Sequence, residues 1–225
     1  MLTESAKTLV PKFFDETGTT YDGVVSYGTL GKDKYWKRKM LEQISDGSSF
    51  LDLACGTGIL TREIAEKFPN SKIVGIDITK SYLEVAKKNS SYFENISFIL
   101  DDAEEFKLDS KFDCITASYL PKYCDPEILV KNCTAHLKPG GKIIFHDFTY
   151  PKNLVVRGLW NLFLTSLRLV GCFIPSWKDA LIGLPKLIRR TKWLESYSDV
   201  MKKNGLNVNR QYLTCGASAI LTGTK

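Results

Sequence analysis

The stretch LDLACGTGILT, residues 51–61, combines an acidic side chain with two glycines in a short loop. Asp52 stands near the end of an apolar run, Gly56 and Gly58 follow, and helix-forming residues come next. A glycine turn between a strand and a helix is a common cradle for nucleotides. A dinucleotide fingerprint needs a third glycine, where this chain has Thr61, and no Gly-Lys-Ser/Thr of a phosphate-binding loop follows. The loop therefore predicts a nucleoside ligand without a phosphate group.

The carboxylate of Asp52 favours a ligand that carries positive charge. At the end of the strand we expect it to face the bound molecule, where it would repel a pyrophosphate and attract a cation. S-adenosylmethionine carries a sulfonium and an ammonium and no phosphate. The sequence therefore predicts S-adenosylmethionine as the cofactor, with S-adenosylhomocysteine as its product.

Polar residues also follow the next three predicted strands. Asp77 ends KIVGID, 21 positions after Gly56, near the spacing at which a carboxylate reaches ribose hydroxyls, although NAD proteins share this step. Asp101 and Asp102 follow ISFIL, where an acceptor can meet the adenine amino group, and Ser118 follows FDCITA. An aspartate after a strand is as often a helix cap as a ligand, so the prediction depends on these positions together.

The order of apolar runs predicts the fold that brings these residues together. Between Phe50 and Asp147, short apolar runs alternate with helix-like stretches, which is typical of a parallel sheet with helices on both faces. After Gly205, the runs LNVNRQYLT and GASAILTGT have no helix between them and predict an antiparallel hairpin. We expect an α/β fold: a Rossmann-like, seven-stranded, mostly parallel sheet with a C-terminal antiparallel hairpin and a helical lid.

A chain of 225 residues with 44% apolar residues is long enough for one domain with an elaboration. The expected parts of this single domain are an N-terminal helical cap (1–45), a cofactor-binding core (48–147), a helical lid or substrate region (151–204) and the C-terminal hairpin (205–225).

Composition limits the location and the metal content. The amino terminus lacks the pattern of a secretory signal, so a cytoplasmic protein is expected. Six cysteines and two histidines are scattered without a Cys-x-x-Cys pair, so neither a disulfide framework nor a metal site is expected.

Basic residues are concentrated in the last third of the chain. Residues 1–150 contain 19 Lys/Arg and 22 Asp/Glu, a net charge of −3, whereas residues 151–225 contain 12 and 3, a net charge of +9. This asymmetry indicates an anionic partner, either nucleic acid or lipid headgroups. The alternative is that the basic residues form a solvated surface that only keeps the protein soluble. RNA is disfavoured because no RNA-binding module is visible. Peripheral membrane contact and a homodimer are both compatible with the sequence.

The stretch LVVRGLWNLFLTSLRLVGCFIPSW, residues 154–177, is strongly apolar. Arg157 and Arg168 interrupt it, so a transmembrane helix is not expected. An amphipathic lid that accepts a polyprenyl tail, or that lies on a lipid surface, is the favoured interpretation. The alternative is an ordinary buried helix pair that closes the site.

The chain resembles a known family beyond the glycine loop, which by itself identifies only class I S-adenosylmethionine-dependent methyltransferases. Segments near both ends of the chain are similar to those of the UbiE/MenG family of ubiquinone and menaquinone C-methyltransferases. They are FFDETGTTYDGVVSYGTLGKDKYWKRKML near the amino terminus, and LPKLIRRT, SYSDVMKKNGL and YLTCGASAILTGTK near the carboxyl terminus. The resemblance implies methylation of a ring carbon of a prenylated quinol in respiratory quinone biosynthesis.

The resemblance also implies which residues contact the cofactor. Tyr21 matches an N-terminal tyrosine that covers the cofactor in such folds. The alternative interpretation is that its ring packs a helix onto the core. The remaining implied contacts are Thr61, Asp77, Ile78, Asp102, Ala103 and Ser118.

One departure concerns the acceptor. After the fourth strand the family has S-F-G-[LI]-R-N, whereas this chain has Ser-Tyr-Leu-Pro-Lys-Tyr, so that Lys122 replaces the arginine and Tyr123 the asparagine. A non-standard quinone, another lipid or a small aromatic acceptor therefore stays open.

Methylation of a carbon ortho to a phenol needs a general base. Asp147 aligns with a family glutamate and is the favoured candidate, while His146 is as well explained as a core residue. Lys122 or Tyr123 would polarise the phenolate. Arg189, together with Arg190, matches a family arginine that could contact the ring oxygens, or lies on an exposed basic helix face.

Overall fold

A computed structural model describes residues 9–14 and 17–225 of the chain. Residues 1–8 and 15–16, which include the start of the expected cap and the aspartate that follows Phe14 in the family pattern, lie outside the described residues.

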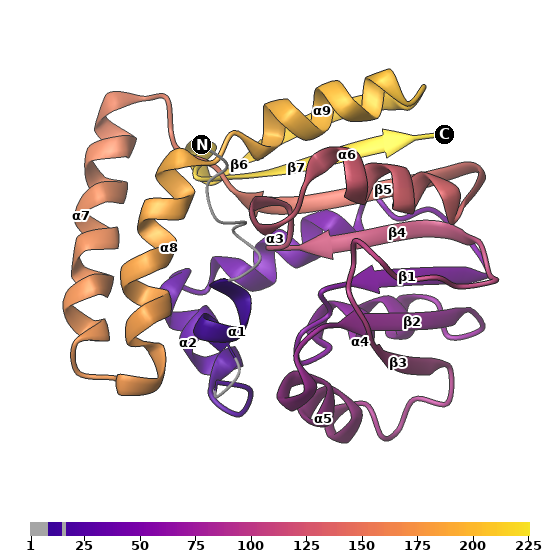
Figure 1. Ribbon diagram of the computed structural model, residues 1–225, viewed down its shortest axis with the longest axis horizontal. Helices are drawn as coiled ribbons and strands as arrows, with labels where there is room; N and C mark the ends of the chain where they lie inside the picture. The colour runs from indigo at the N-terminus through magenta and orange to yellow at the C-terminus, as the bar shows by residue number, and fades with distance from the viewer. Residues whose placement is uncertain (1–8, 15–16) are drawn as a thin grey trace.

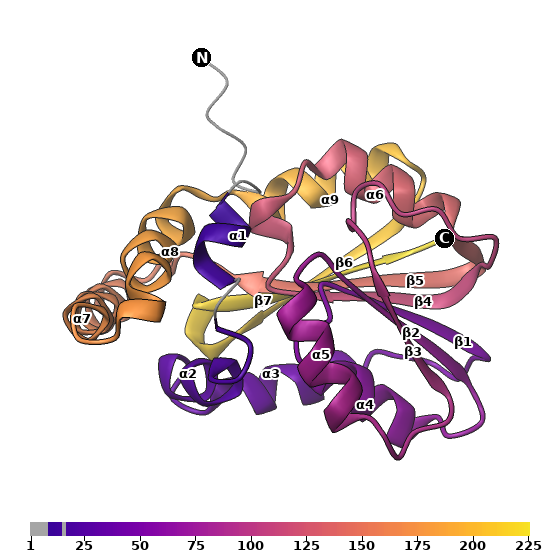
Figure 2. The same ribbon diagram turned by 60° about the horizontal axis from the view of Figure 1, so that its bottom comes forward.

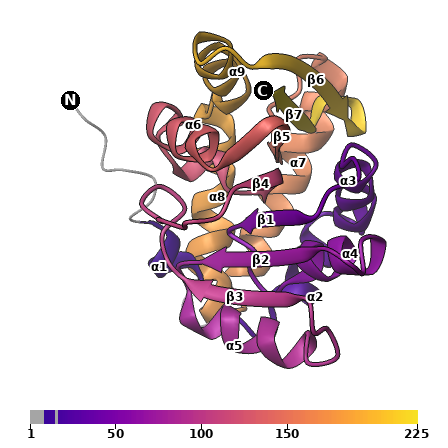
Figure 3. The ribbon, with the colours of Figure 1, turned by 90° about the vertical axis from the view of Figure 1, so that its right-hand side faces the viewer.

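A single seven-stranded sheet forms the centre of the molecule, in the order β3-β2-β1-β4-β5-β7-β6 (Figure 3). The first five strands pair in parallel, and β7 pairs antiparallel with both β5 and β6. The strands are β1 (Ser49–Leu53), β2 (Lys72–Asp77), β3 (Ile96–Leu100), β4 (Phe112–Ser118), β5 (Leu137–Phe148), β6 (Asn207–Leu213) and β7 (Ser218–Thr224). The predicted sheet and its terminal hairpin are confirmed.

Helices cover both faces of the sheet, as Figure 2 shows. On one face α6 (Pro126–Ala135) and α9 (Trp193–Lys203) pack against the strands, and on the other α3 (Lys32–Leu41), α4 (Ile59–Lys67) and α5 (Lys80–Asn89) do so. Because both faces are covered, the central strands are apolar on both sides, as in β1, where Phe50 and Leu51 point to opposite faces and both are buried.

Four further helices form a layer beyond the carboxyl ends of the parallel strands (Figure 1). They are α1 (Leu9–Phe14), α2 (Tyr21–Gly28), α7 (Leu154–Gly171) and α8 (Lys178–Arg190). Here α7 and α8 lie side by side, with α7 outermost. A third apolar cluster, which includes Phe13, Tyr123, Leu164 and Trp177, joins this layer to the sheet. Short 3-10 turns occur at η2 (Pro121–Tyr123), η3 (Pro175–Trp177) and η4 (Thr214–Gly216).

Candidate active site

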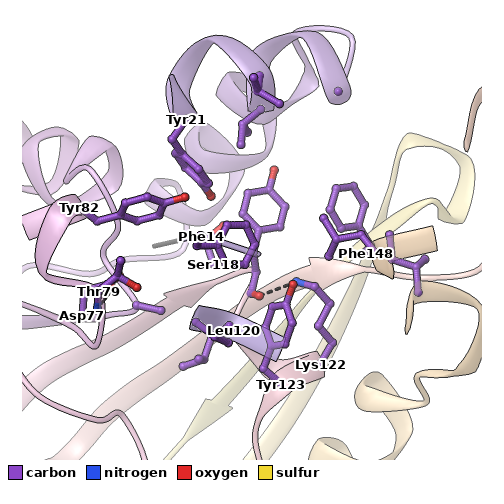
Figure 4. Close-up of a pocket in the computed structure, with 18 of the residues that line it drawn as sticks. Phe14, Tyr21, Asp77, Thr79, Tyr82, Ser118, Leu120, Lys122, Tyr123 and Phe148 are labelled. Atoms are coloured by element: carbon purple, nitrogen blue, oxygen red, sulfur yellow. Dashed lines mark hydrogen bonds between the residues drawn. The ribbon is translucent and has the colours of Figure 1, made fainter. Parts of the chain in front are cut away.

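One pocket lies between the carboxyl ends of the parallel strands and the helical layer (Figure 4). Its sheet side includes Asp77, Asp102 and Ser118, which end or follow β2, β3 and β4. Its other side is lined mainly by apolar side chains of α1, α2, α7 and α8. In an open α/β sheet this edge is where ligands bind, so the pocket lies where the sequence predicted a site.

The glycine loop is held to the end of β2 by a carboxylate. Gly56 and Gly58 have φ angles of 57° and 77°, a left-handed conformation that side chains disfavour. The backbone N–H of Gly56 donates to Asp77 Oδ2 at 2.8 Å, and that of Thr79 donates to Asp77 Oδ1 at 2.8 Å. Burial raises the pKa of Asp77, while these hydrogen bonds lower it. Asp77 thus fixes the glycine loop against the end of β2, and it lines the pocket.

Asp52 and Thr61 lie beneath the loop instead of on the pocket wall. Asp52 is 2% exposed, and its two oxygens accept hydrogen bonds from Thr61 Oγ1 at 2.7 Å and Thr116 Oγ1 at 2.8 Å. Burial raises the pKa of Asp52 to about 6. The expectation that Asp52 faces the bound molecule is corrected. Asp52 precedes the last residue of β1, so its side chain leaves the face of the sheet toward α4 and ties α4 to β4.

The other expected cofactor contacts line the pocket. Ile78 is 46% exposed there, beside the carboxylate of Asp77, and offers an apolar surface to an adenine ring. Asp102 accepts the N–H of Glu104 at 2.9 Å, and Ala103 follows it on the same wall. The structure thus brings these residues together with Ser118, whereas Gly56 and Gly58 are not among the residues that line the pocket.

Tyr21 covers the pocket from α2, and three hydrogen bonds hold this cover in place. Its ring centroid lies 4.9 Å from that of Tyr82, and its ring stacks on Trp177 at 6.1 Å. The hydrogen bonds join Thr57 to Asp22 at 2.6 Å, Tyr82 to Thr17 at 2.7 Å and Trp177 to Thr20 at 2.9 Å. Sequence reasoning missed Tyr82, Trp177, Asp22 and Thr57. The only signal was the aromatic content of both flanking segments.

Two residues at strand ends are in an unusual backbone conformation. Ala54 follows β1 with φ 50°, and Tyr119 follows β4 with φ 65°, and both line the pocket. Residues other than glycine rarely adopt these angles, and such strain concentrates at functional sites. The Tyr119 hydroxyl donates to Asp33 Oδ1 at 2.8 Å, a residue of α3, which fixes the turned segment.

A buried ion pair lies at the acceptor side of the pocket. Lys122 Nζ lies 3.0 Å from Asp147 Oδ1 and also donates to the carbonyl oxygen of Tyr119. Asp147 Oδ2 accepts the backbone N–H of Lys122 at 3.0 Å. Burial lowers the pKa of Lys122 and raises that of Asp147, and each charge opposes the shift of the other. Lys122 lines the pocket, whereas Asp147 is fully buried and does not line it. The expectation that Asp147 acts as the general base is therefore corrected, because its oxygens are engaged within the core.

Tyr123 lies next to Lys122, whose Nζ is 4.4 Å from the centroid of its ring. Tyr123 is 6% exposed and lines the pocket. Within the part of the chain that the structure describes, its buried hydroxyl has no hydrogen-bond partner, and the same holds for the indole Nε1 of Trp160 on α7. Buried polar groups are nearly always paired, so two unpaired donors at one apolar pocket indicate a polar ligand.

His146 is part of the core. Its Nδ1 lies 3.0 Å from Ser118 Oγ and its Nε2 lies 2.6 Å from Ser218 Oγ, and the residue is fully buried. Burial lowers its pKa well below the usual value. Because both nitrogens are engaged, its assignment as a candidate catalytic base is corrected.

Arg189 is also outside the pocket. It is exposed, and its Nε donates to Asn161 Oδ1 at 3.1 Å, which links α8 to α7. The proposed contact with ring oxygens is replaced by a contact within the helical layer, because Arg189 lies on the outer side of α8, away from the pocket-lining Ile188.

The residues on the strand-end side of the pocket suit S-adenosylmethionine. Asp77 can accept from the ribose, and Ile78 and Ala103 can contact adenine. In residues 9–14 and 17–225 no group of three or more His, Cys, Asp or Glu could hold a metal ion.

The sheet order and this site define a class I S-adenosylmethionine-dependent methyltransferase. Residues 44–167 match the protein family described as "Methyltransferase domain". The chain belongs to this family.

Individual proteins show the same similarity. The ubiquinone/menaquinone biosynthesis C-methyltransferase UbiE of Hahella chejuensis is 29% identical over 226 residues, which cover 96% of this chain and 91% of the relative. The demethylmenaquinone methyltransferase of Chlorobaculum tepidum is 27% identical over 91% of this chain and 87% of its own length. The structure of the plantazolicin methyltransferase BpumL, with S-adenosylhomocysteine bound, superposes with a TM-score of 0.66 at 13% identity, covering 98% of this chain and 95% of its own. The predicted enzyme class and cofactor are confirmed.

Proposed function

We propose that this enzyme methylates a ring carbon of a lipophilic quinol, of the prenylated kind used in respiration, at the cytoplasmic side of a membrane. The observation that carries the proposal is the unpaired hydroxyl of Tyr123 beside Lys122 at an apolar pocket. The names of the quinone-biosynthesis relatives support the same acceptor class.

The shape and polarity of the pocket agree with a large apolar acceptor. Leu164 and Leu167 of α7 and Leu184 of α8 line the pocket on the side of the helical layer, opposite the strand ends that would hold the cofactor. A prenylated ring entering between these helices would bury its tail against apolar side chains, which contributes about 25 cal/mol per Å² of apolar surface removed from water. The same helices exclude water from the reacting groups.

Two donors without a partner in the described residues, the Tyr123 hydroxyl and the Trp160 indole N–H, belong to residues that line the pocket. The Tyr123 hydroxyl and the Trp160 indole N–H can each donate to an acceptor oxygen, which would satisfy both groups. A site built to pair with an oxygen rejects analogues that lack it, because its own donors would stay unpaired. These two residues therefore orient the ring.

Lys122 supplies charge where the phenolic oxygen would develop it. The quinol would react as its phenolate, with the phenolic proton released to water before the site closes and the displaced ring proton released to water with the product. A phenolate makes its ortho carbon electron-rich, and an ammonium group in a water-excluded site stabilises that phenolate strongly. Asp147 has no access to the pocket and both of its oxygens already accept hydrogen bonds, so it positions Lys122. S-adenosylmethionine, when bound, supplies a methyl group on a sulfonium centre, and the protein holds the ring in line with it.

A second candidate is methylation of another lipid or a small aromatic compound. The observation in its favour is the pair Lys122 and Tyr123, which stand where the quinone family has arginine and asparagine. Both functions would use the same pocket and the same cofactor.

The test is methyl transfer from labelled S-adenosylmethionine to a panel of reduced acceptors. The panel contains demethylated benzoquinols and naphthoquinols with short and long prenyl tails, together with unprenylated phenols. We expect label on a ring carbon of a prenylated quinol, located by mass spectrometry. Label on an oxygen, or only on unprenylated phenols, would replace the proposed acceptor with the second candidate.

A further inference from the structure

The outermost helix carries an exposed face without charged residues. Ten exposed positions of α7 and the following turn recur at helical spacing, and all are apolar or uncharged: Leu154, Val155, Gly158, Leu159, Leu162, Thr165, Ser166, Leu169, Cys172 and Phe173. Leu159 and Leu162 are 65% and 69% exposed, and Phe173 is 85% exposed. An exposed apolar surface of this extent usually marks an interaction site.

The opposite face of α7 is occupied. Leu164 and Leu167 are buried in the apolar cluster of the helical layer, and Gly171 packs closely against Leu181 of α8. Among the described residues, α7 is the one helix long and apolar enough to cross a membrane, with a mean hydropathy of 1.2 and 17% of its residues buried. Because α8 covers one side along its length, α7 is suited to lie in an interface with its outer face in contact with lipid.

The charges around this face select the partner. Residues 151–192 contain eight basic side chains and one acidic side chain, a net charge of +7. Lys152, two residues before α7, and Lys178, the first residue of α8, are exposed. Arg157 and Arg168 of α7 are half-buried. Lys and Arg side chains beside an apolar helix face are attracted to anionic headgroups. A second copy of this chain would instead bring two strongly positive surfaces together.

We propose that the outer face of α7 docks the enzyme on an anionic lipid bilayer. The inner face of the same helix lines the pocket through Trp160, Leu164 and Leu167. One helix thus has lipid on its outer side and the acceptor pocket on its inner side, and a lipophilic acceptor can move from the bilayer into the pocket along the lid. This inference rests on the proposed function for the nature of the acceptor, but the docking itself requires neither acceptor nor cofactor.

The test is cosedimentation of the whole chain with vesicles, without cofactor or acceptor. Vesicles of phosphatidylcholine alone are compared with vesicles that also contain phosphatidylglycerol, at low and high salt. The variant Leu159→Gln/Leu162→Gln changes two side chains that lie outside the pocket. The matched control, Tyr92→Gln/Ile128→Gln, changes two exposed apolar side chains on other parts of the surface. Phe173→Ser provides a second variant outside the body of the helix.

We expect the wild type and the control to bind the anionic vesicles, with weaker binding at high salt. The α7 variant should bind roughly tenfold more weakly or worse, since it removes two apolar contacts with lipid. Equal binding of the α7 and Phe173 variants and the wild type would overturn the proposal. The proposal would also be overturned if the wild type did not bind vesicles but formed a dimer that the variants dissociate. The outer face of α7 would then bind a second copy of the chain.

Methylation of a short-chain, water-soluble quinol without vesicles separates the two proposals. The α7 variant should match the wild type in this assay. If no quinol is methylated while the vesicle result stands, the proposed function fails and the docking surface remains.

Discussion

Lys122 Nζ lies 3.0 Å from Asp147 Oδ1, and the two side chains are 2% and 0% exposed. Asp147 also accepts the backbone N–H groups of Lys122 and Phe148. The ion pair is therefore fixed at both ends, with the ammonium at the pocket and the carboxylate in the core.

Removing one partner of this pair should destabilise the fold. Lys122→Met leaves the buried Asp147 carboxylate without its counter-charge, and we expect a loss of roughly 3–5 kcal/mol in the free energy of unfolding. Urea denaturation measures this loss. The double variant Lys122→Met/Asp147→Leu should recover much of the stability and none of the methyl transfer. A double variant as unstable as the single one would show that the pair does not act as a unit.

Replacing Lys122 by arginine tests its role in the reaction. Arginine keeps the positive charge and is the family's residue at this position, so Lys122→Arg should retain more activity than Lys122→Gln. If both variants had the same kcat, the charge at this position would not contribute to the reaction.

Tyr123→Phe should lower activity with little effect on stability. The hydroxyl has no partner within the described residues, so its removal breaks no internal hydrogen bond. Loss of a hydrogen bond to a charged oxygen in the transition state predicts a decrease of roughly ten- to a hundredfold in kcat/KM. Steady-state kinetics and thermal unfolding together check this outcome.

Tyr197→Phe is the matched control. Tyr197 is fully buried and donates to the carbonyl oxygen of Cys124 at 3.3 Å, but it does not line the pocket. We expect the opposite pattern, in which the melting temperature falls and kcat/KM is kept. Equal effects of the two variants on kcat/KM would remove the assigned role of Tyr123.

The sequence predicted the sheet and the edge of the sheet at which Asp77, Asp102 and Ser118 line the pocket, because both follow from local patterns. Apolar runs alternating with helices specify parallel strands, and the carboxyl ends of such strands meet at one edge. The orientation of individual side chains was less accessible. Asp52 lies one residue before the end of β1 and turns beneath the loop, and His146 is enclosed between two serines from different strands. Both orientations depend on neighbours distant in sequence.

The contacts that hold the helical layer to the sheet domain could not be predicted for the same reason. Tyr82 belongs to α5 and Trp177 precedes α8, yet both meet α2 and the segment before it. No local spacing encodes these contacts. The sequence indicated only that both flanking segments are aromatic and helical.

Asp77→Ala should weaken the binding of S-adenosylmethionine. The variant removes the acceptor of the Gly56 and Thr79 N–H groups and the carboxylate expected to accept from the ribose. We expect roughly a hundredfold weaker binding in calorimetry. Asp113→Ala is the control, because Asp113 accepts from Ser48 and Ser49 at the opposite end of the sheet. Unchanged affinity in Asp77→Ala would overturn the placement of the ribose.

Asp52 should make stability depend on pH. Burial raises its pKa in the folded protein to about 6, against 3.8 for an ordinary aspartate. Between these values the folded state binds more protons than the unfolded state, so the free energy of unfolding decreases as pH rises from about 4 to about 6 and this contribution is constant above. The difference in pKa corresponds to roughly 3 kcal/mol.

Asp52→Asn removes this titration and keeps a side chain of similar shape. Thr116 Oγ1 lies 3.4 Å from the carbonyl oxygen of Leu51, so its hydroxyl can turn to donate there and accept from the new amide. The stability of the Asp52→Asn variant relative to the wild type should increase as pH rises through this range, and the difference should level off near pH 7. Urea denaturation of both proteins at a series of pH values measures it. A difference that does not change between pH 4 and 7 would show that the carboxyl group of Asp52 titrates normally in the folded protein.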